Sequence, residues 1–290
     1  MVEAVKGKFV RVVTSTTFVL LLVVAVVPAA HAQEYLSAGD VATISGASAA
    51  VAGLGHLAKK LDSTRAPWIG GPFLLDRVFA RWFGGKPDPE VTNFLDGPFG
   101  APATPLVTSM VMTSFNVSWP RHNRDKDALQ DLFLFSAGLV ATKGVTDIYK
   151  GLFARPRPLV YMHPEIASRR ADYDYRYDRR SFFSGHTSSA FFSMAYLNLR
   201  TRTVMRNKMS PSDYRDWQWL PPTVCFSWAS FVGFSRIHAW KHYFSDVVFG
   251  ALAGWLIAEL FFNLDDVAYP SDGHAGSTSS SSIVRISFSF

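Results

Sequence analysis

Apolar runs of helical length, separated by polar segments and by glycine or proline, are the strongest constraint on the fold. Their apolar residues recur at spacings of three and four, while the alternation typical of strands is scarce. A run of this kind forms a helix that buries one face against its neighbours. The sequence therefore predicts an all-α bundle of about six core helices. The expected helices cover residues 41–61, 104–119, 129–149, 187–199, 222–233 and 243–262.

Composition leaves open whether this bundle lies partly in a membrane. Hydrophobic residues make up 48% of the chain and the mean hydropathy is +0.10, between the values of a soluble enzyme and of a polytopic membrane protein. Polar residues interrupt the apolar runs, among them Asp147, Asn198 and Glu259. The bundle is therefore expected to be either partly membrane-embedded or fully exported.

The first residues have the three-part pattern of a secretory signal peptide. Lys6, Lys8 and Arg11 precede an apolar run at 18–30, and "AHA" follows it just before Gln33. This pattern predicts export to the cell envelope, with an uncleaved anchor as the alternative. The predicted division is a signal peptide at 1–32, a helical domain at 33–266 with its chemical core at 129–262, and a Ser- and Gly-rich linker and tail at 267–290.

The net charge of +6 indicates anionic partners. No nucleic-acid motif accompanies this charge, so phosphate groups and acidic lipid surfaces are the expected partners. A merely basic surface is the alternative. Cys225 is the only cysteine, so a disulfide within this sequence is excluded.

Two segments place cationic and imidazole side chains beside helix ends. In "KGLFARPRP", Lys150 and Arg157 are seven residues apart, which predicts that both point to one side of a helix ended by the prolines. In "FSGHTSS", Ser184 and Gly185 precede an apolar run, so the backbone N–H groups of a helix start can bind an anion there. A helix cap explains Ser184 but gives no reason for the histidine at His186.

The segment "SRIHAWKHYFSD" admits two interpretations. His238, His242 and Asp246 are spaced by four, and on one helix face they would form a set of metal ligands. Arg236 argues against a cation, because its guanidinium suits phosphate oxygens and no fourth ligand is evident. In the anionic interpretation, Asp246 accepts from one ring nitrogen of His242 and leaves the other free as a nucleophile or base.

Together these motifs resemble the three-part signature of the type 2 phosphatidic acid phosphatase superfamily. This group includes lipid phosphate phosphatases, bacterial non-specific acid phosphatases and vanadium haloperoxidases. The resemblance covers residues 129–262 and departs at Phe183, where the family usually has proline. The matching residues are Lys150, Arg157 and Pro158, then Ser184, Gly185 and His186, and finally Ser235, Arg236, His242 and Asp246.

The resemblance implies a phosphatase that works without a metal ion or other cofactor. Lys150, Arg157 and Arg236 would hold the phosphate oxygens. The backbone N–H groups near Ser184 and Gly185 would complete the phosphate site.

The resemblance also implies roles in catalysis. His242 would attack phosphorus and form a phosphohistidine, with Asp246 orienting the ring and His186 protonating the leaving oxygen. Two nearby residues fall outside the signature. Arg155 is expected to be peripheral, and His238 to have a structural or supporting position.

The expected substrate is a lipid phosphate or pyrophosphate at the periplasmic face. A soluble periplasmic acid phosphatase is the alternative, and a vanadate-dependent haloperoxidase is a further one. The complete set of motif residues argues against a non-catalytic scaffold. A polar loop at 159–183 should border the pocket, and a basic loop at 200–208 should face the cytoplasm. A cleaved signal peptide would leave the mature N-terminus outside the cytoplasm. If all three helices before Lys150 then crossed the membrane, the site would face the cytoplasm. A periplasmic site needs an even number of crossings before Lys150, or none, which is met if the helix at 41–61 does not cross.

Overall fold

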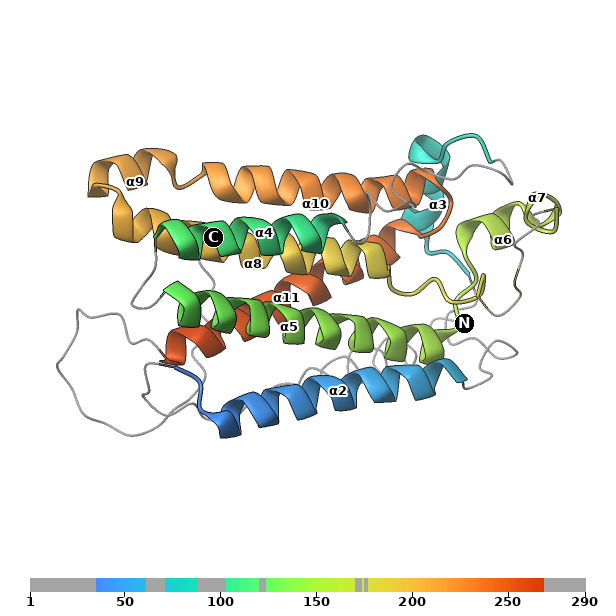
Figure 1. Ribbon diagram of the computed structural model, residues 1–290. Helices are drawn as coiled ribbons and strands as arrows, with labels where there is room; N and C mark the ends of the chain where they lie inside the picture. Colours follow the sequence, from blue (N-terminus) through green and yellow to red (C-terminus); the bar gives the residue numbers. More distant parts are fainter. Residues whose placement is uncertain are drawn as a thin grey trace, which may run out of the picture.

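The computed structural model describes residues 35–60, 71–87, 103–119, 124–169, 174 and 177–268, and within these ranges it contains helices and turns but no strand (Figure 1). The predicted signal peptide at 1–32 and residues 269–290 of the predicted tail lie outside the described residues. The helices are α2 (Ala38–Lys60), α3 (Leu74–Phe83), α4 (Ala103–Ser118), α5 (Arg124–Phe153), α6 (Pro158–Met162), α7 (Pro164–Ala167), α8 (Gly185–Lys208), α9 (Pro211–Trp217), α10 (Leu220–His238) and α11 (Phe244–Ala268).

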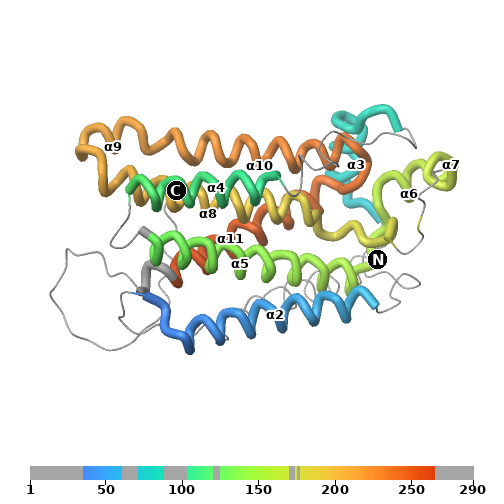
Figure 2. The backbone as a smooth tube through the Cα atoms, viewed as in Figure 1, coloured from blue at the N-terminus to red at the C-terminus, as the bar shows by residue number. Residues whose placement is uncertain are grey.

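The all-α prediction is confirmed. Every expected core helix is present as a long helix, namely α2, α4, α5, α8, α10 and α11. These helices lie lengthwise beside one another, so that their ends gather at two ends of the bundle (Figure 1). The short helices α3, α6 and α7 lie together at one end and α9 lies at the other (Figure 2).

Two segments expected to be loops are helical. Residues 158–167, within the predicted loop at 159–183, form α6 and α7. Pro158 and Pro164 each occupy the first turn of a helix, where the missing N–H is tolerated. Residues 200–208 are the last turns of α8, and Arg206 and Lys208 there complement the helix dipole.

Small residues bring α2 and α5 into close contact. A Cβ on Gly144 would lie 2.7 Å from the backbone N of Ala52, and a Cβ on Gly55 would lie 2.6 Å from the backbone O of Gly144. Gly151 faces Ala58 further along both helices. Because the numbers of the contacting residues rise together, α2 and α5 run parallel, as Figure 1 shows.

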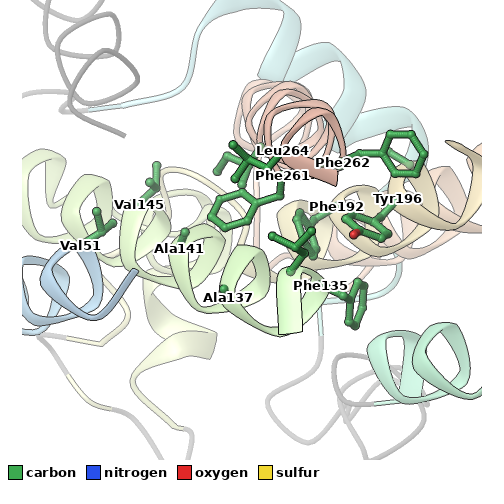
Figure 3. Close-up of a cluster of buried hydrophobic side chains, with 14 of the residues drawn as sticks. Val51, Phe135, Ala137, Ala141, Val145, Phe192, Tyr196, Phe261, Phe262 and Leu264 are labelled. Atoms are coloured by element: carbon green, nitrogen blue, oxygen red, sulfur yellow. The ribbon is translucent and has the colours of Figure 1, made fainter. Parts of the chain in front are cut away.

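The main core lies between α5, α8 and α11 and is rich in aromatic residues (Figure 3). The rings of Phe192 and Tyr196 on α8 have centroids 5.4 and 5.6 Å from that of Phe135 on α5. Tyr196 also meets Phe262 of α11 edge-on at 5.5 Å. Aromatic pairs favour such tilted and edge-on geometries. The core therefore fixes α8 relative to α5 and α11.

A buried polar network joins three helices at the end of the bundle away from α3. Asn116 of α4 donates to Asp131 of α5 at 2.6 Å, and Nε of Arg200 on α8 lies 2.9 Å from the same carboxylate. Arg200 also donates to the side-chain oxygen of Asn116. The side chains of Asp131 and Arg200 are each 1% exposed, so removing either charge would leave the other buried and unpaired.

Within the described ranges, three helical segments are long and apolar enough to cross a membrane. They are Ala38–Lys60, Asp125–Met162 and Phe244–Leu264. Large apolar side chains also face outward from α4 and α10, including Leu106, Met110, Trp228 and Phe231. An apolar surface of this extent is typical of a protein that contacts lipid or a partner.

Candidate active site

The three sequence motifs meet at one end of the bundle, where α5 ends, α8 begins and α10 is followed by α11 (Figure 2). The backbone N–H of Ser184 donates to the backbone carbonyl of Asp246 at 3.1 Å, which joins the second motif to the third. Lys150 and Arg157 of the first motif lie close enough to act electrostatically on His242. Segments far apart in the sequence are thus gathered around one histidine.

The ring of His242 is buried and faces two hydrogen-bonding side chains. Its Nδ1 lies 3.7 Å from Oδ2 of Asp246 and 3.4 Å from Oγ of Ser181. Ser181 donates to the same Asp246 oxygen, which also accepts from the backbone N–H of Tyr243 at 2.9 Å. Because Nδ1 faces these groups, Nε2 is the nitrogen that remains for chemistry.

Burial lowers the pKa of His242 to about 3. The neighbouring carboxylate of Asp246 opposes this shift, while the charges of Lys150 and Arg157 add to it. The imidazole is therefore neutral near pH 7. A neutral imidazole keeps the lone pair that a nucleophile needs.

The third motif does not form one continuous helix, so His238, His242 and Asp246 do not share the helix face that the metal-ligand interpretation required. α10 ends at His238, and α11 begins only after a turn in which Trp240 has a φ of 56°. His238 is exposed and its Nδ1 lies 3.0 Å from the backbone carbonyl of Phe83. It therefore has a structural position, in contact with the last residue of α3. Among the residues that the structure describes, no group of three His, Cys, Asp or Glu side chains is arranged for a metal ion.

Arg155, expected to be peripheral, is instead fully buried in an ion-pair network. Its Nη1 donates to Oδ1 of Asp246 and its Nη2 donates to Oδ2 of Asp76, each at 2.6 Å. The guanidinium carbon lies 4.1 Å from the ring centroid of Tyr243 and 5.1 Å from that of Phe73. The prediction failed because the family signature specifies only the residues of the phosphate site, while Arg155 binds the carboxylates of Asp76 and Asp246.

Arg157 does not share a helix with Lys150, contrary to the prediction. α5 ends just before Ala154, which has a φ of 46°, and Arg157 is the extended residue preceding α6. The Nη1 of Arg157 lies 3.5 Å from Oδ1 of Asp178, and its guanidinium carbon lies 4.2 Å from the ring centroid of Tyr177. The turn, and not a helical repeat, therefore brings Arg157 near Lys150 and the histidine.

The predicted anion cradle is the start of α8. Ser184 caps this helix, since its Oγ accepts from the backbone N–H of Thr187 at 3.4 Å and from the hydroxyl of Thr187 at 2.8 Å. A Cβ on Gly185 would lie 3.2 Å from Nζ of Lys150. The ammonium group therefore lies beside the first turn of α8, where backbone N–H groups and the helix dipole favour an anion.

The remaining predicted residues occupy the same end of the bundle. Arg236, 2% exposed in the last turn of α10, accepts from the backbone N–H of His242 at 3.2 Å through its own backbone carbonyl. His186 is the second residue of α8 and is partly exposed. Phe183, the departure from the family pattern, is buried with its ring centroid 5.3 Å from that of Tyr149. It contributes to the core under the site.

Sequence reasoning missed Asp76 and Ser181. Asp76 is 1% exposed and accepts a hydrogen bond from the backbone N–H of Ser245, 169 residues away. Its one sequence signal is an acid three residues after Phe73, a spacing typical of helix capping. Ser181 follows a polar, arginine-rich stretch and has no pattern that distinguishes it.

Comparison with known proteins gives a consistent picture. Residues 131–268 match the family model described as the PAP2 superfamily. Phospholipid phosphatase 2 of Homo sapiens is 32% identical over 161 residues, which are 48% of this chain and 50% of that protein. Probable diacylglycerol pyrophosphate phosphatase 1 of Schizosaccharomyces pombe is 36% identical over 86 residues, 29% of each chain. This chain thus spans half or less of these two relatives.

A solved structure also aligns with the chain. It is the crystal structure of the first transmembrane PAP2 type phosphatidylglycerolphosphate phosphatase from Bacillus subtilis. The alignment covers 88% of this chain and 95% of that chain, at 18% identity and a TM-score of 0.41. A likeness at this level carries no argument about the site.

Proposed function

Because residues 131–268 match the PAP2 superfamily, we propose that this chain is a phosphatase that removes phosphate from a phosphorylated lipid. One observation carries the proposal. A buried, neutral His242 faces Asp246, with Lys150, Arg157 and the start of α8 close by. A nucleophile surrounded by cations and a helix N-terminus is suited to attack a bound phosphate.

In the first step, the lone pair on Nε2 of His242 forms a bond to phosphorus, and the bond from phosphorus to the ester oxygen breaks. His186 gives its proton to the departing oxygen, so that the alcohol leaves neutral. Asp246 faces Nδ1 and balances the positive charge that the phosphorylated ring acquires.

In the second step, water hydrolyses the phosphohistidine. His186, now neutral, takes a proton from the water, whose oxygen attacks phosphorus. The electrons of the nitrogen–phosphorus bond return to His242, and inorganic phosphate leaves. Both histidines are then in their starting protonation states.

The cationic side chains supply the charge stabilisation that phosphoryl transfer requires. Lys150, Arg157 and Arg236 would bind the phosphoryl oxygens, together with the backbone N–H groups that follow Ser184. These groups are held by the fold before substrate arrives, so little reorganisation accompanies the reaction. The proposed mechanism uses no metal ion or other cofactor.

Two observations support a lipid as the substrate. The relatives are named for phospholipid and diacylglycerol pyrophosphate phosphatases. Three helical segments of the described chain are long and apolar enough to cross a membrane. The proposed partner is therefore a phosphorylated lipid at a membrane surface.

The test measures phosphate release from a phosphatidate, a polyprenyl pyrophosphate, a lipid A phosphate and a soluble monoester, each with and without EDTA. Lipid phosphates are expected to be hydrolysed fastest and EDTA to have no effect. His242→Ala is expected to abolish release, while His238→Ala, in the same segment but exposed and facing Phe83, retains it. Activity that survives His242→Ala would refute the mechanism, and a preference for the soluble monoester would refute the lipid substrate in favour of an acid phosphatase.

We also propose that the site faces the periplasm. The end of α8 away from the site carries Arg202, Arg206 and Lys208, a charge bias typical of the cytoplasmic side. Because α2 and α5 run parallel, Ala38 lies at that same end, opposite Lys150. A cleaved signal peptide would leave Ala38 outside the cytoplasm. A cleaved signal peptide and a periplasmic site are therefore compatible only if α2 does not cross the membrane.

A further inference from the structure

Asp76 connects α3 to the candidate site, although it lies outside the residues that match the superfamily. Its carboxylate is buried. Oδ1 accepts from the backbone N–H of Ser245 at 2.8 Å, and Oδ2 accepts from Arg155 at 2.6 Å and from the backbone N–H of Phe73 at 2.9 Å. Ser245 directly precedes Asp246, so Asp76 holds the chain at the first turn of α11.

Arg155 bridges this carboxylate and the one beside the histidine. Its Nη1 donates to Asp246 at 2.6 Å and to Oγ of Ser245 at 2.8 Å, while its Nη2 donates to Asp76. The side chains of Arg155, Asp76 and Asp246 are fully buried. Buried charges have no water to bind, so each must keep the hydrogen bonds that it makes to its partner. The network is therefore expected to be rigid.

The bridge assigns each oxygen of Asp246 to a different partner. Oδ1 is held by Arg155, and Oδ2 faces Nδ1 of His242 at 3.7 Å and accepts from Ser181. Rotation of the carboxylate would break the charged hydrogen bond to Arg155. By binding Oδ1, Arg155 therefore keeps Oδ2 of Asp246 facing the imidazole.

Asp76 also sets the net charge beside His242. Arg155 and Asp246 alone would form a neutral pair, which could not balance a positively charged ring. With Asp76 present, the two carboxylates and one guanidinium carry a net negative charge. That charge is available when the ring becomes phosphorylated.

We propose that Asp76 is a positioning residue for phosphoryl transfer. Acting through Arg155, it fixes Asp246 toward His242 and supplies the negative charge that stabilises the phosphorylated ring. This inference rests on the proposed phosphatase function, and it places a residue of α3 in the machinery of the site.

The test compares Asp76→Asn and Asp76→Glu in the full chain with Asp131→Asn as a matched control. Asp131 also pairs with a buried arginine, Arg200. It lies about 28 Å along α5 from Lys150, so it has no contact with the site. Each purified variant is assayed for phosphatidate hydrolysis across a pH series, and its thermal midpoint is measured in the same detergent.

Asp76→Asn is expected to lower kcat by about ten- to a hundred-fold while KM changes little, because the phosphate-binding cations remain. Losing a negative charge also disfavours the protonated form of His242, so the acidic limb of kcat/KM moves to lower pH. The other charged groups around the ring, Asp246, Lys150 and Arg157, are unchanged. Asp76→Glu keeps the charge and recovers part of the rate.

Asp131→Asn is expected to lower the thermal midpoint and to leave kcat, KM and the pH profile unchanged. Asp76→Asn with the kcat and pH profile of the wild type would overturn the proposal. So would a loss of activity that is uniform in pH and is not recovered by Asp76→Glu, because that result indicates a merely structural role.

A wild-type protein that hydrolyses no phosphate ester would refute the proposed function, and the positioning role then has its own test. Nitrogen NMR of histidine-labelled protein reports which ring nitrogen of His242 carries the proton. The wild type is expected to hold the proton on Nδ1, and Asp76→Asn to show a mixture of tautomers. Identical tautomers in both proteins would overturn the positioning role.

Discussion

Ser181 Oγ lies 3.4 Å from Nδ1 of His242 and donates to the Asp246 oxygen that faces the same nitrogen. The hydroxyl, the imidazole and the carboxylate are all buried. The ring of His242 is therefore held from two directions, by a charged group and by a neutral one.

Ser181→Ala is expected to lower kcat by about ten-fold, the effect of one hydrogen bond to a charged group. Ser181→Thr keeps the hydroxyl and should retain more of the rate. Ser193→Ala is the control, since Ser193 is buried and its hydroxyl has no hydrogen-bond partner in the described part of the chain. Steady-state kinetics of the three variants check the prediction, and equal rates for Ser181→Ala and Ser193→Ala would contradict it.

The buried imidazole of His242 should make the folded protein sensitive to acid. Its pKa is about 3 in the folded state, against 6.5 for an ordinary histidine, so the unfolded chain binds a proton that the folded site resists. With respect to this group, the free energy of unfolding is therefore highest above pH 6.5, where neither state binds the proton. It falls as pH falls from 6.5 toward 3, because the unfolded chain then binds the proton first. The slope is up to about 1.4 kcal/mol per pH unit.

Denaturant titrations over this pH range test the acid sensitivity. His242→Gln is expected to reduce the fall in the free energy of unfolding, while His238→Gln, at an exposed position, behaves as the wild type. An undiminished fall in His242→Gln would show that other groups cause the acid sensitivity.

Lys150→Met is expected to weaken inhibition by inorganic phosphate by about ten- to a hundred-fold, because one charged hydrogen bond to the anion is lost. Lys143→Met serves as the control. Lys143 lies two turns earlier on α5, is exposed and pairs with Asp147 at 2.7 Å. Inhibition constants for phosphate report the difference, and an equal loss in both variants would mean that Lys150 acts only through overall charge.

Gly250→Ala is expected to destabilise the protein by about 1–3 kcal/mol, since a Cβ there would lie 2.8 Å from the backbone carbonyl of Ser184. The strain would also separate the start of α8 from α11 and reduce activity. Gly53→Ala in α2 meets nothing within 4 Å and is expected to stabilise the helix by about 0.5–1 kcal/mol. Thermal melting distinguishes the two, and a harmless Gly250→Ala would show that the two helices adjust.

The membrane orientation is testable with single cysteines in a Cys225→Ala background. Ser168 follows α7 at the site end and Ser212 lies in α9 at the opposite end, and both are exposed. In intact cells, a membrane-impermeant maleimide is expected to label Ser168→Cys and not Ser212→Cys. The reverse pattern would place the site in the cytoplasm, and equal labelling of both would refute a membrane-spanning bundle.

The long helices were predictable because the apolar residues that recur at helical spacing are the residues that the fold buries between neighbouring helices. The break between α10 and α11 was not, because residues 239–243 contain neither glycine nor proline. Contacts from distant segments stabilise the turn instead. The indole of Trp240 donates to the backbone carbonyl of Gly85 at 2.6 Å, and its own carbonyl accepts from the backbone N–H of Leu159 at 3.2 Å.

The site could be predicted only as far as local motifs extend. Lys150, Arg157, Ser184 and His242 lie in segments whose spacing carries information, and the structure brings those segments together. Asp76 acts on residues far along the chain, so no local pattern reveals its carboxylate as a partner of the site.

The hydrogen bond between Ser184 and Asp246 is made by main-chain atoms on both sides. Under the proposed mechanism, exchanging His242 is expected to stop turnover without removing this main-chain bond, so the inactive protein is expected to keep its binding groups assembled. Such a variant could retain an uncleaved ester through purification. Mass spectrometry of the extracted ligand would then identify the natural lipid directly from the cell, without a choice of candidate substrates.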